Sequence, residues 1–305
     1  FTNSLIPASR HSRVARQIIE LIPAPTRATL TDNYFASAPL IFDRDTTDVK
    51  INWNRSSKFS MFGRYSFLDF STVSAQALGR AGGGPIQPGG QPGNGYGRTT
   101  SITVAGTYIF GPTFLVDANF GFGRQSPTVT AFDYGQNVGL EVLRIPGANG
   151  PNVFQSGTPG FDVSGYESYG TSGSSNPFFW RDNQFQYNAN AGWVRGAHSV
   201  RFGLDLSRQH MNHRQAEFSG SLGPRGGFEF AGGPAALNGG LSPNQFNSFA
   251  TFLLGLPTRI GKSLQTELPY STRNWGQGYY FRDQWQATRN LTLTLGVRYE
   301  FYPIP

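Results

Sequence analysis

The 305-residue sequence has no cysteine, few charged residues and no long apolar run. The lack of cysteine excludes a disulfide scaffold and thiolate metal sites. Charged residues make up 14%, against about 25% in typical soluble domains. Without about 18 consecutive apolar residues, no transmembrane helix is predicted. Strands that alternate lipid-facing and lumen-facing residues keep an average hydropathy near neutral, so the mean hydropathy of −0.35 does not exclude a membrane protein.

Glycine, proline and aromatic residues are abundant, with 39 Gly, 20 Pro and 26 Phe. This composition favours strands and turns over helices. The net charge of +7 comes from Lys and Arg residues spread along the chain. Because no recognised motif or basic block accompanies that charge, nucleic acid is not a predicted partner. Exposed arginines are better suited to the phosphates of lipopolysaccharide.

The clearest period-two alternation lies between residues 291 and 301. One face carries Leu291, Leu293, Leu295, Val297, Tyr299 and Phe301, and the other carries Thr292, Thr294, Gly296, Arg298 and Glu300. The strand before it, joined through a turn at 287–290, places Trp275, Tyr279, Phe281 and Trp285 on one face. Asp283 falls on that aromatic face as an exception near the turn. The pattern predicts a hairpin with one apolar face.

Three further hairpins repeat this design. They pair residues 49–53 with 59–67, 102–110 with 114–122, and 185–193 with 200–206. About eight strands in four hairpins are therefore predicted, each about 10 to 14 residues long, which is enough to cross an apolar band when tilted.

Short turns alternate with long, Gly/Pro-rich connections at 71–98, 125–177 and 214–272. Outer-membrane barrels have short periplasmic turns and long extracellular loops, which explains the alternation. Trp53, Trp193 and Trp285 lie at the short-turn ends of strands, as expected of a membrane interface. The predicted fold class is all-β, with antiparallel up-and-down transmembrane strands forming part of a barrel in the cell outer membrane.

Two short helices are expected within or beside the loops, and neither is assigned a function. The first covers 12–21, with Val14, Ile18 and Leu21 on one stripe. The second covers 243–254, with the stripe Phe246, Phe249, Ala250 and Leu253.

No set of residues indicates catalysis, a cofactor or a metal. His210 and His213 should point to opposite faces of a strand, and Asp43, Asp45 and Asp48 lack the glycine and glutamate of a calcium loop. The glycine runs at 82–84 and 93–97 do not lead from a strand into a helix, so flexible loops are expected there. The protein is not predicted to be an enzyme.

The chain resembles Oar-like TonB-dependent receptors in three places. These are Ile6-Pro7-Ala8-Ser9-Arg10 with the residues that follow it, Gly196 to Gly203, and the stretch from Phe281-Arg282-Asp283-Gln284-Trp285 to Leu291 through Glu300. The resemblance covers nearly the whole chain and is one of barrel strands. It implies a barrel of about 22 strands, an N-terminal plug, and import driven by the TonB complex through that plug.

On this interpretation residues 1–305 are a fragment of one β-barrel domain, without the plug. Residues 1–40 form a lead-in segment with a short helix, and 41–305 form barrel hairpins and loops. The implied function is to bind a nutrient at the cell surface and import it. The expected partners are outer-membrane lipid, lipopolysaccharide, the TonB complex through the missing plug region, and an unknown oligosaccharide, peptide or metal chelate.

Two alternatives remain. Eight strands suffice for a small closed barrel that acts as a surface-binding or structural protein. A soluble or filament-forming β protein would instead pack its apolar faces on each other.

Candidate ligand contacts come from the polar strand faces and from loop aromatics. They are Arg64, Asp117, Asn119, Arg201, Asp205, Arg298, Glu300, Tyr96, Tyr166 and Tyr169. A structural ladder of ion pairs on the inner wall is the competing interpretation of the charged members of this set.

Overall fold

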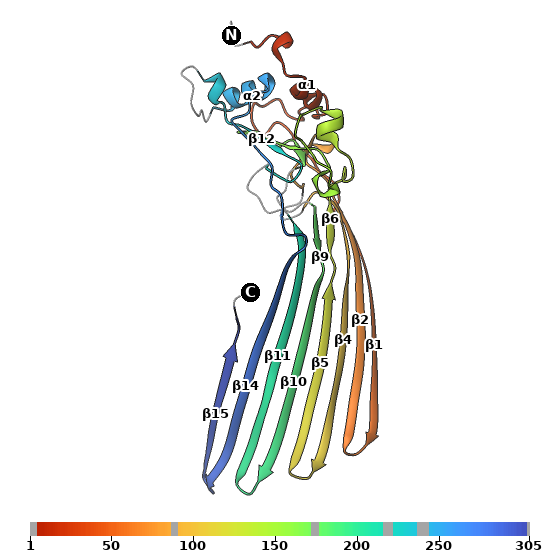
Figure 1. Ribbon diagram of the computed structural model, residues 1–305, viewed down its shortest axis with the longest axis vertical. Coiled ribbons are helices and arrows are strands. Elements are labelled where there is room, and N and C mark those ends of the chain that lie inside the picture. The colour runs from red at the N-terminus through yellow and green to blue at the C-terminus, as the bar shows by residue number, and fades with distance from the viewer. Residues whose placement is uncertain (1–4, 87–90, 172–176, 216–221, 237–243, 304–305) are drawn as a thin grey trace.

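The computed structural model describes residues 5–86, 91–171, 177–215, 222–236 and 244–303. A long, curved sheet of antiparallel strands carries a cap of loops and short helices at one end (Figure 1). The eight long strands are β1 (Ile41–Ser56), β2 (Phe59–Ser74), β4 (Gly93–Gly111), β5 (Phe114–Gln125), β10 (Asp182–Arg195), β11 (His198–Gln215), β14 (Tyr270–Thr288) and β15 (Leu291–Phe301).

These strands form the four predicted hairpins. Each pairs with its sequence neighbour in the order β1-β2-β4-β5-β10-β11-β14-β15. All four hairpin turns lie at the end of the sheet away from the cap (Figure 1). The turns are tighter than predicted, with two residues between the strands of each hairpin, such as Gly196 and Ala197. Gly196 has φ +58°, a backbone conformation that glycine adopts without the steric cost of a Cβ.

The strand register keeps apolar residues together on one face, called the outer face here. Val49 lies opposite Tyr65, which lies opposite Ile102, and Ile102 lies opposite Phe122. On the same face, nearer the β15 edge of the sheet, Phe202 lies opposite Phe281. The outer-face residues of this apolar band include Ile51, Tyr65, Ile102, Val104, Phe120, Phe122, Phe185, Tyr187, Phe202, Leu204, Tyr279, Phe281, Leu295, Val297 and Tyr299.

The apolar band is solvent-accessible in the isolated sheet. Ile51 is 69% exposed and Val297 is 67% exposed. Soluble monomers rarely expose apolar patches beyond a few hundred Å². The band therefore argues against the soluble and filament alternatives.

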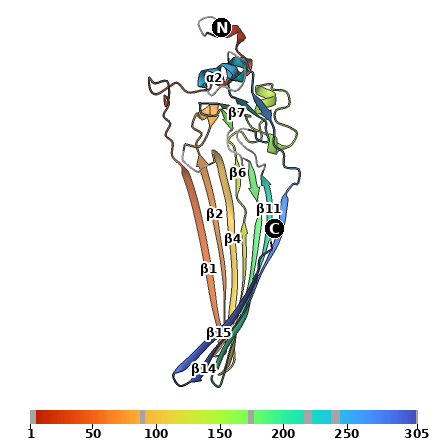
Figure 2. The same cartoon turned by 90° about the vertical axis from the view of Figure 1, so that its left-hand side faces the viewer.

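The sheet is open, with β1 and β15 at its edges. Within the described residues β1 pairs with β2 and β15 pairs with β14, and neither edge pairs with the other. Figure 2 shows the sheet from the side of β15, with β14 and β15 crossing in front of the other strands at the end away from the cap. The eight strands thus do not close into the small barrel considered as an alternative.

The cap contains the remaining elements. Its helices are α1 (Arg13–Ile19) and α2 (Gln245–Leu254), with short 3-10 or π turns at Ala8–Arg10, Gly79–Ala81, Val138–Val142, Val153–Gln155 and Gly233–Ala235. Its short strands are β3 (Gly82–Gly83), β6 (Thr128–Thr130), β7 (Gly160–Val163), β8 (Gly170–Thr171), β9 (Phe178–Trp180), β12 (Gly227–Phe230) and β13 (Arg259–Gly261). Neither α-helix of the described chain is long and apolar enough to cross a bilayer.

The main hydrophobic core of the described chain lies in this cap. Phe252 of α2 is 1% exposed, and its ring lies 5.4 Å from the rings of Tyr169 and Phe230 and 6.5 Å from that of Phe161. Helix α1 adds Ala15 and Ile18 to the same cluster. The two helices are joined where the Ser12 N–H donates to the Leu253 carbonyl at 2.6 Å.

Two expectations about the loops are therefore wrong. The glycine runs at 82–84 and 93–97 do not form flexible loops, because Gly82 and Gly83 pair with β8 and residues 93–97 begin β4. The apolar stripe predicted for the second helix is also not the face that the helix buries. Helix α2 buries Ser248, Thr251 and Phe252, whereas Phe246 is 61% exposed; Pro243, the predicted first residue, lies outside the described residues.

Candidate functional site

The inner face of the sheet, opposite the apolar band, brings several predicted site residues into hydrogen-bonded groups. Arg298 Nη2 lies 3.1 Å from Asp205 Oδ2, and Arg298 Nε lies 2.5 Å from Glu300 Oε1. Gly278 lies between Asp205 and Glu300 in the register, and a Cβ there would lie 3.3 Å from Arg298 Nη2. Three predicted residues thus form one charged group across β11, β14 and β15.

A second group lies nearer the turns. Asn190 Nδ2 donates to Asp117 Oδ2 at 2.7 Å, and Arg201 Nη2 lies 3.8 Å from Asp117 Oδ1. Tyr280 donates its hydroxyl to Asn190 Oδ1 at 2.6 Å. The group links β5, β10, β11 and β14 across the inner face.

The remaining inner-face candidates pair with residues that were not predicted to contact a ligand. Arg64 Nε donates to both carboxylate oxygens of Asp48, at 3.0 and 2.9 Å. Asn119 Oδ1 accepts a hydrogen bond from Asn188 Nδ2 at 2.9 Å. Every charged inner-face candidate therefore has an oppositely charged partner, which is the arrangement expected of a structural ladder.

The cap holds a cavity of about 780 Å³. Tyr34, Tyr166 and Phe249 contribute aromatic rings, and those of Tyr166 and Phe249 lie 5.1 Å apart. Its polar lining includes Asp32, Asn33, Glu167 and Gln245, and its further lining includes Ile19, Ile22, Pro23, Pro25, Leu30 and Pro85. No lysine or arginine lines the cavity among the described residues. Apolar walls with a few polar groups are typical of small-molecule sites.

The sequence-predicted loop tyrosines have different positions. Tyr166 lines the cavity and is 37% exposed, so it is available to a ligand. Tyr169 also contributes to the lining, but it is 4% exposed and belongs to the cap core. Burial raises the pKa of Tyr169 to about 12 and raises that of Tyr166 by a smaller amount.

Tyr96 was predicted in a loop and instead lies in β4, on the outer face with Arg98. The surrounding glycines explain the error. A Cβ at Gly95 would lie 2.6 Å from Thr72 Cγ2, and one at Gly97 would lie 2.8 Å from Pro127 Cα. These glycines permit close packing against β4 rather than loop flexibility.

A second buried part of the cap, a polar cluster, was not predicted. Arg225 is 1% exposed and donates from Nε to the Ser156 carbonyl at 2.9 Å. Burial lowers the pKa of Arg225 to about 10, and the nearby Asp133 carboxylate opposes that shift. Asn149 donates from Nδ2 to the Gln155 and Gly157 carbonyls, both at 2.8 Å. These contacts satisfy backbone groups that would otherwise be buried without partners.

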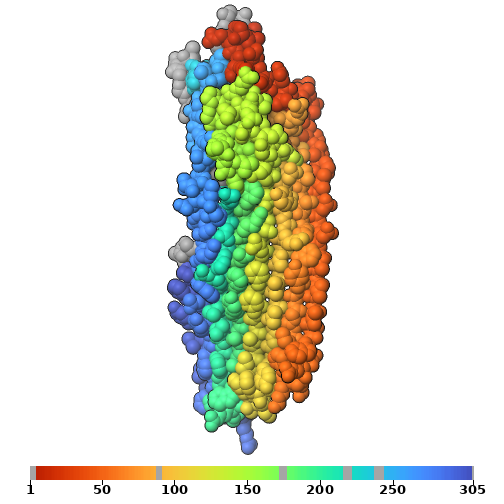
Figure 3. Space-filling model, turned by 45° about the vertical axis from the view of Figure 1, so that its right-hand side comes forward, coloured from red at the N-terminus to blue at the C-terminus, as the bar shows by residue number. Residues whose placement is uncertain are grey.

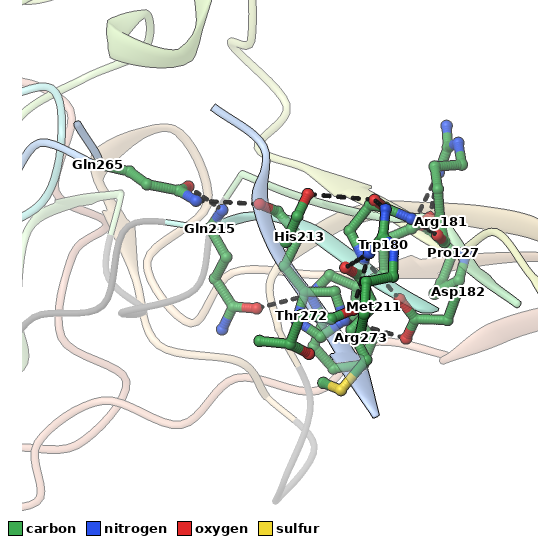
Figure 4. Close-up of polar contacts among 12 residues, drawn as sticks. Pro127, Trp180, Arg181, Asp182, Met211, His213, Gln215, Gln265, Thr272 and Arg273 are labelled. Carbon is green, nitrogen blue, oxygen red and sulfur yellow. Dashed lines mark hydrogen bonds and ion pairs between the residues drawn. The ribbon is translucent and has the colours of Figure 1, made fainter. Parts of the chain in front are cut away.

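A polar junction connects the cap to the top of the sheet (Figure 4). Gln265 Oε1 accepts from the Gln215 N–H at 2.6 Å, and its Nε2 donates to the His213 carbonyl at 2.9 Å. His213 Nε2 lies 3.0 Å from Asp182 Oδ2. Figure 3 shows the chain that follows β5 packed directly on the strand ends. The cap is thus attached to the strands by specific contacts.

The histidines and aspartates that were not expected to bind a metal contact other side chains or lie on different faces of the sheet. His213 pairs with Asp182, and Arg208 Nε lies 3.1 Å from His210 Nε2. Asp48 binds Arg64 on the inner face, whereas Asp43 and Asp45 share the outer face with Asp69. Among the residues that the structure describes, no group of three or more His, Asp or Glu side chains is placed to hold a metal ion.

A family model described as an outer membrane beta barrel domain matches residues 1–305. The chain belongs to this family. The barrel therefore lies in the outer membrane, and the resemblance seen in its strand motifs is confirmed at this level. The all-β, antiparallel fold class is confirmed as well. Among curated proteins, none matches the sequence of this barrel.

Several solved structures are similar to most of this chain at low sequence identity. P. aeruginosa FpvA bound to heterologous pyoverdines is 9% identical with a TM-score of 0.43, and the match covers 86% of this chain and 30% of that one. The siderophore receptor PiuA from Acinetobacter baumannii is 11% identical with a TM-score of 0.36, with coverage of 92% and 40%. The copper transporter OprC is 9% identical with a TM-score of 0.37, with coverage of 84% and 29%. The chain spans 29% to 40% of the length of these three structures.

Membership of the family orients the molecule. The apolar band faces lipid, the inner face lines the lumen, and the long connections lie on the extracellular side.

Proposed function

We propose that this chain is part of a TonB-dependent receptor that binds a nutrient in the cap cavity and imports it with TonB-transmitted energy. The observation that carries the proposal is the cavity itself, which lies in a folded extracellular cap and is lined by Tyr166 and Phe249. A barrel that served only as a wall would not need loops with a core of their own. The strand motifs that resemble TonB-dependent receptors support the energised step.

The open sheet edges support the view that these residues are part of a larger barrel domain. An unpaired strand edge in lipid leaves N–H and C=O groups without partners, at a cost of several kcal/mol for each group. β1 and β15 would therefore pair with further strands of the same domain. The plug that contacts the TonB complex would belong to that larger protein.

The lining chemistry restricts the ligand class. Asp32 and Glu167 give the cavity two carboxylates, and no cation of the described chain lines it. A negatively charged metal chelate would be repelled there. A neutral oligosaccharide or a peptide fits better, because aromatic walls and the amides of Asn33 and Gln245 suit both.

Binding to the assembled protein in outer-membrane vesicles tests the ligand assignment. The probes are a panel of fluorescent neutral oligosaccharides, a tripeptide library and an anionic ferric chelate. We expect an oligosaccharide or peptide to bind, and Tyr166→Ala to weaken that binding about tenfold. Phe246→Ala is the matched control, because this exposed aromatic of α2 does not line the cavity. Binding of the chelate alone, or equal binding by both variants, would refute the assignment.

Uptake of the bound probe by whole cells tests the energised step separately. TonB-driven import requires the proton-motive force, so a protonophore should abolish accumulation while leaving surface binding intact. Accumulation that continues at the same rate after protonophore treatment would exclude TonB-dependent import.

A further inference from the structure

The outer face changes from apolar to cationic within one step of the strand register. One row contains Ile102, Phe122 and Phe185, which lie opposite each other on β4, β5 and β10, and it continues through Arg208 on β11 to Trp275 on β14. The next row toward the cap contains Arg124 on β5, opposite Asn183 on β10. This boundary is where the lipid-facing band ends on the extracellular side.

Three arginines lie at this boundary and are called the arginine cluster: Arg124, Arg208 and Arg273. Arg124, Asn183, His210 and Arg273 follow one another in register across β5, β10, β11 and β14. Adjacent strands lie about 4.8 Å apart, so Arg124 and Arg273 lie roughly 15 Å apart at the backbone. Arg208 lies two residues from His210 on the same face.

Neutral groups hold each arginine of the cluster in place. Arg273 donates to the Met211 and Thr272 carbonyls at 3.0 and 2.7 Å (Figure 4). Arg208 lies 5.0 Å from the ring centroid of Trp275. Arg124 Nη1 donates to Asn183 Oδ1 at 3.3 Å.

No acidic side chain neutralises the cluster within the described part of the chain. Arg98, which lies on the outer face one register step nearer the cap than Arg124, forms a 2.5 Å ion pair with Asp69. The neighbouring Asp182 lies on the inner side of β10 and pairs with His213. The cluster thus has three positioned guanidinium groups and free donors. Arg208 lies beside lipid-facing aromatic rings, and Arg124 and Arg273 lie one register step above them.

We propose that the arginine cluster binds the phosphate groups of lipopolysaccharide in the outer leaflet. This inference goes beyond the proposed receptor function and assigns residues to the lipopolysaccharide contact that the sequence led us to expect. Arginine pairs with phosphate through two parallel hydrogen bonds. The acyl chains of the same molecule would contact Phe122, Phe185 and Trp275, which lie in the register row of Arg208 and one step on the membrane side of Arg124 and Arg273. A free phosphate would gain nothing from those rings.

The site is tested with the intact protein purified in detergent and purified lipopolysaccharide as the probe. Binding is measured by native mass spectrometry for the wild type and for Arg124→Gln, Arg208→Gln and Arg273→Gln, singly and combined. Each single variant should weaken binding about tenfold if its guanidinium contacts phosphate. Enzymatically dephosphorylated lipopolysaccharide should bind the wild type as weakly as intact lipopolysaccharide binds the triple variant.

Arg282→Gln is the matched control, because it removes the same charge from the inner face near the turns. Retention of lipopolysaccharide by the triple variant at the wild-type level would overturn the proposal. So would full competition by inorganic phosphate at equal concentration, since it would show an anion site without a lipid contribution. If the triple variant does not assemble, the single variants decide the question. Loss of lipopolysaccharide binding with intact ligand binding in the cap would separate this inference from the proposed receptor function.

Discussion

The Tyr280 hydroxyl donates a 2.6 Å hydrogen bond to Asn190 Oδ1 across the glycine of the intervening strand. Asn190, Gly203 and Tyr280 lie side by side in register on β10, β11 and β14. A Cβ at Gly203 would lie 2.5 Å from the Ala189 carbonyl oxygen and 2.7 Å from Tyr280 Cε1. The tyrosine ring therefore lies over the strand only because residue 203 has no side chain.

Replacing Tyr280 with Phe should lower the free energy of unfolding by about 1 kcal/mol, the net value of one hydrogen bond. Gly203→Ala should cost more, because the added methyl displaces both the ring and a backbone contact. Urea unfolding of the protein in lipid vesicles measures both. An equal, negligible effect of the two substitutions would show that this packing does not stabilise the wall.

The cap core predicts a local defect when Phe252 is shortened. Phe252→Ala removes a buried ring that contacts Phe161, Tyr169 and Phe230, and such changes cost about 3 to 5 kcal/mol. We expect limited proteolysis to cleave the cap much faster while the strands stay protected. Phe246→Ala, on the exposed side of the same helix, should leave the cleavage rate unchanged.

Tyr169 predicts an alkaline sensitivity of the cap. Its pKa is raised to about 12 by burial, above the ordinary value of 10, so the folded state holds the proton more tightly. The stabilisation is complete below pH 10 and is lost as the pH rises toward 12. Tyr169→Phe should reduce that loss. Thermal unfolding between about pH 9 and pH 12 measures it, because this range covers the ordinary and the raised pKa of Tyr169. An unchanged pH dependence in the variant would assign the sensitivity to other groups.

The sequence alone was sufficient to predict the strands, their pairing in hairpins and the two faces. Alternation such as Leu293-Thr294-Leu295 is local, so it can be recognised without knowing what the strand touches. Asp283 shows the same point, because its predicted place on the aromatic face is confirmed by its position opposite Leu295. Its carboxylate lies 2.7 Å from His198 Nδ1 near the turn.

The cap was beyond local prediction. Phe161 and Phe252 meet in space although 91 residues separate them in the chain (252 minus 161). No periodicity marks such contacts in a Gly/Pro-rich connection. The buried face of α2 was misjudged for the same reason, since Ser248 and Thr251 are buried only because of what packs against them.

The candidate site was predictable in part. Charged residues on the polar strand face were found from alternation, and the structure pairs Arg298 with Asp205 and Glu300. Tyr166 was predicted as a ligand contact and lines the cavity. The cavity is also lined by Tyr34 and Phe249, which come from distant segments of the chain. Their convergence depends on the tertiary fold.

The most direct test of the account is a pair of arginine substitutions at adjacent positions of β15. Leu295 lies on the lipid-facing band and Thr294 on the inner face. Leu295→Arg should cost about 2 to 4 kcal/mol of folding free energy in lipid vesicles if it lies near the midplane, and Thr294→Arg should cost far less. Equal costs at the two positions would contradict the assignment of the apolar band to lipid and of the polar face to the lumen.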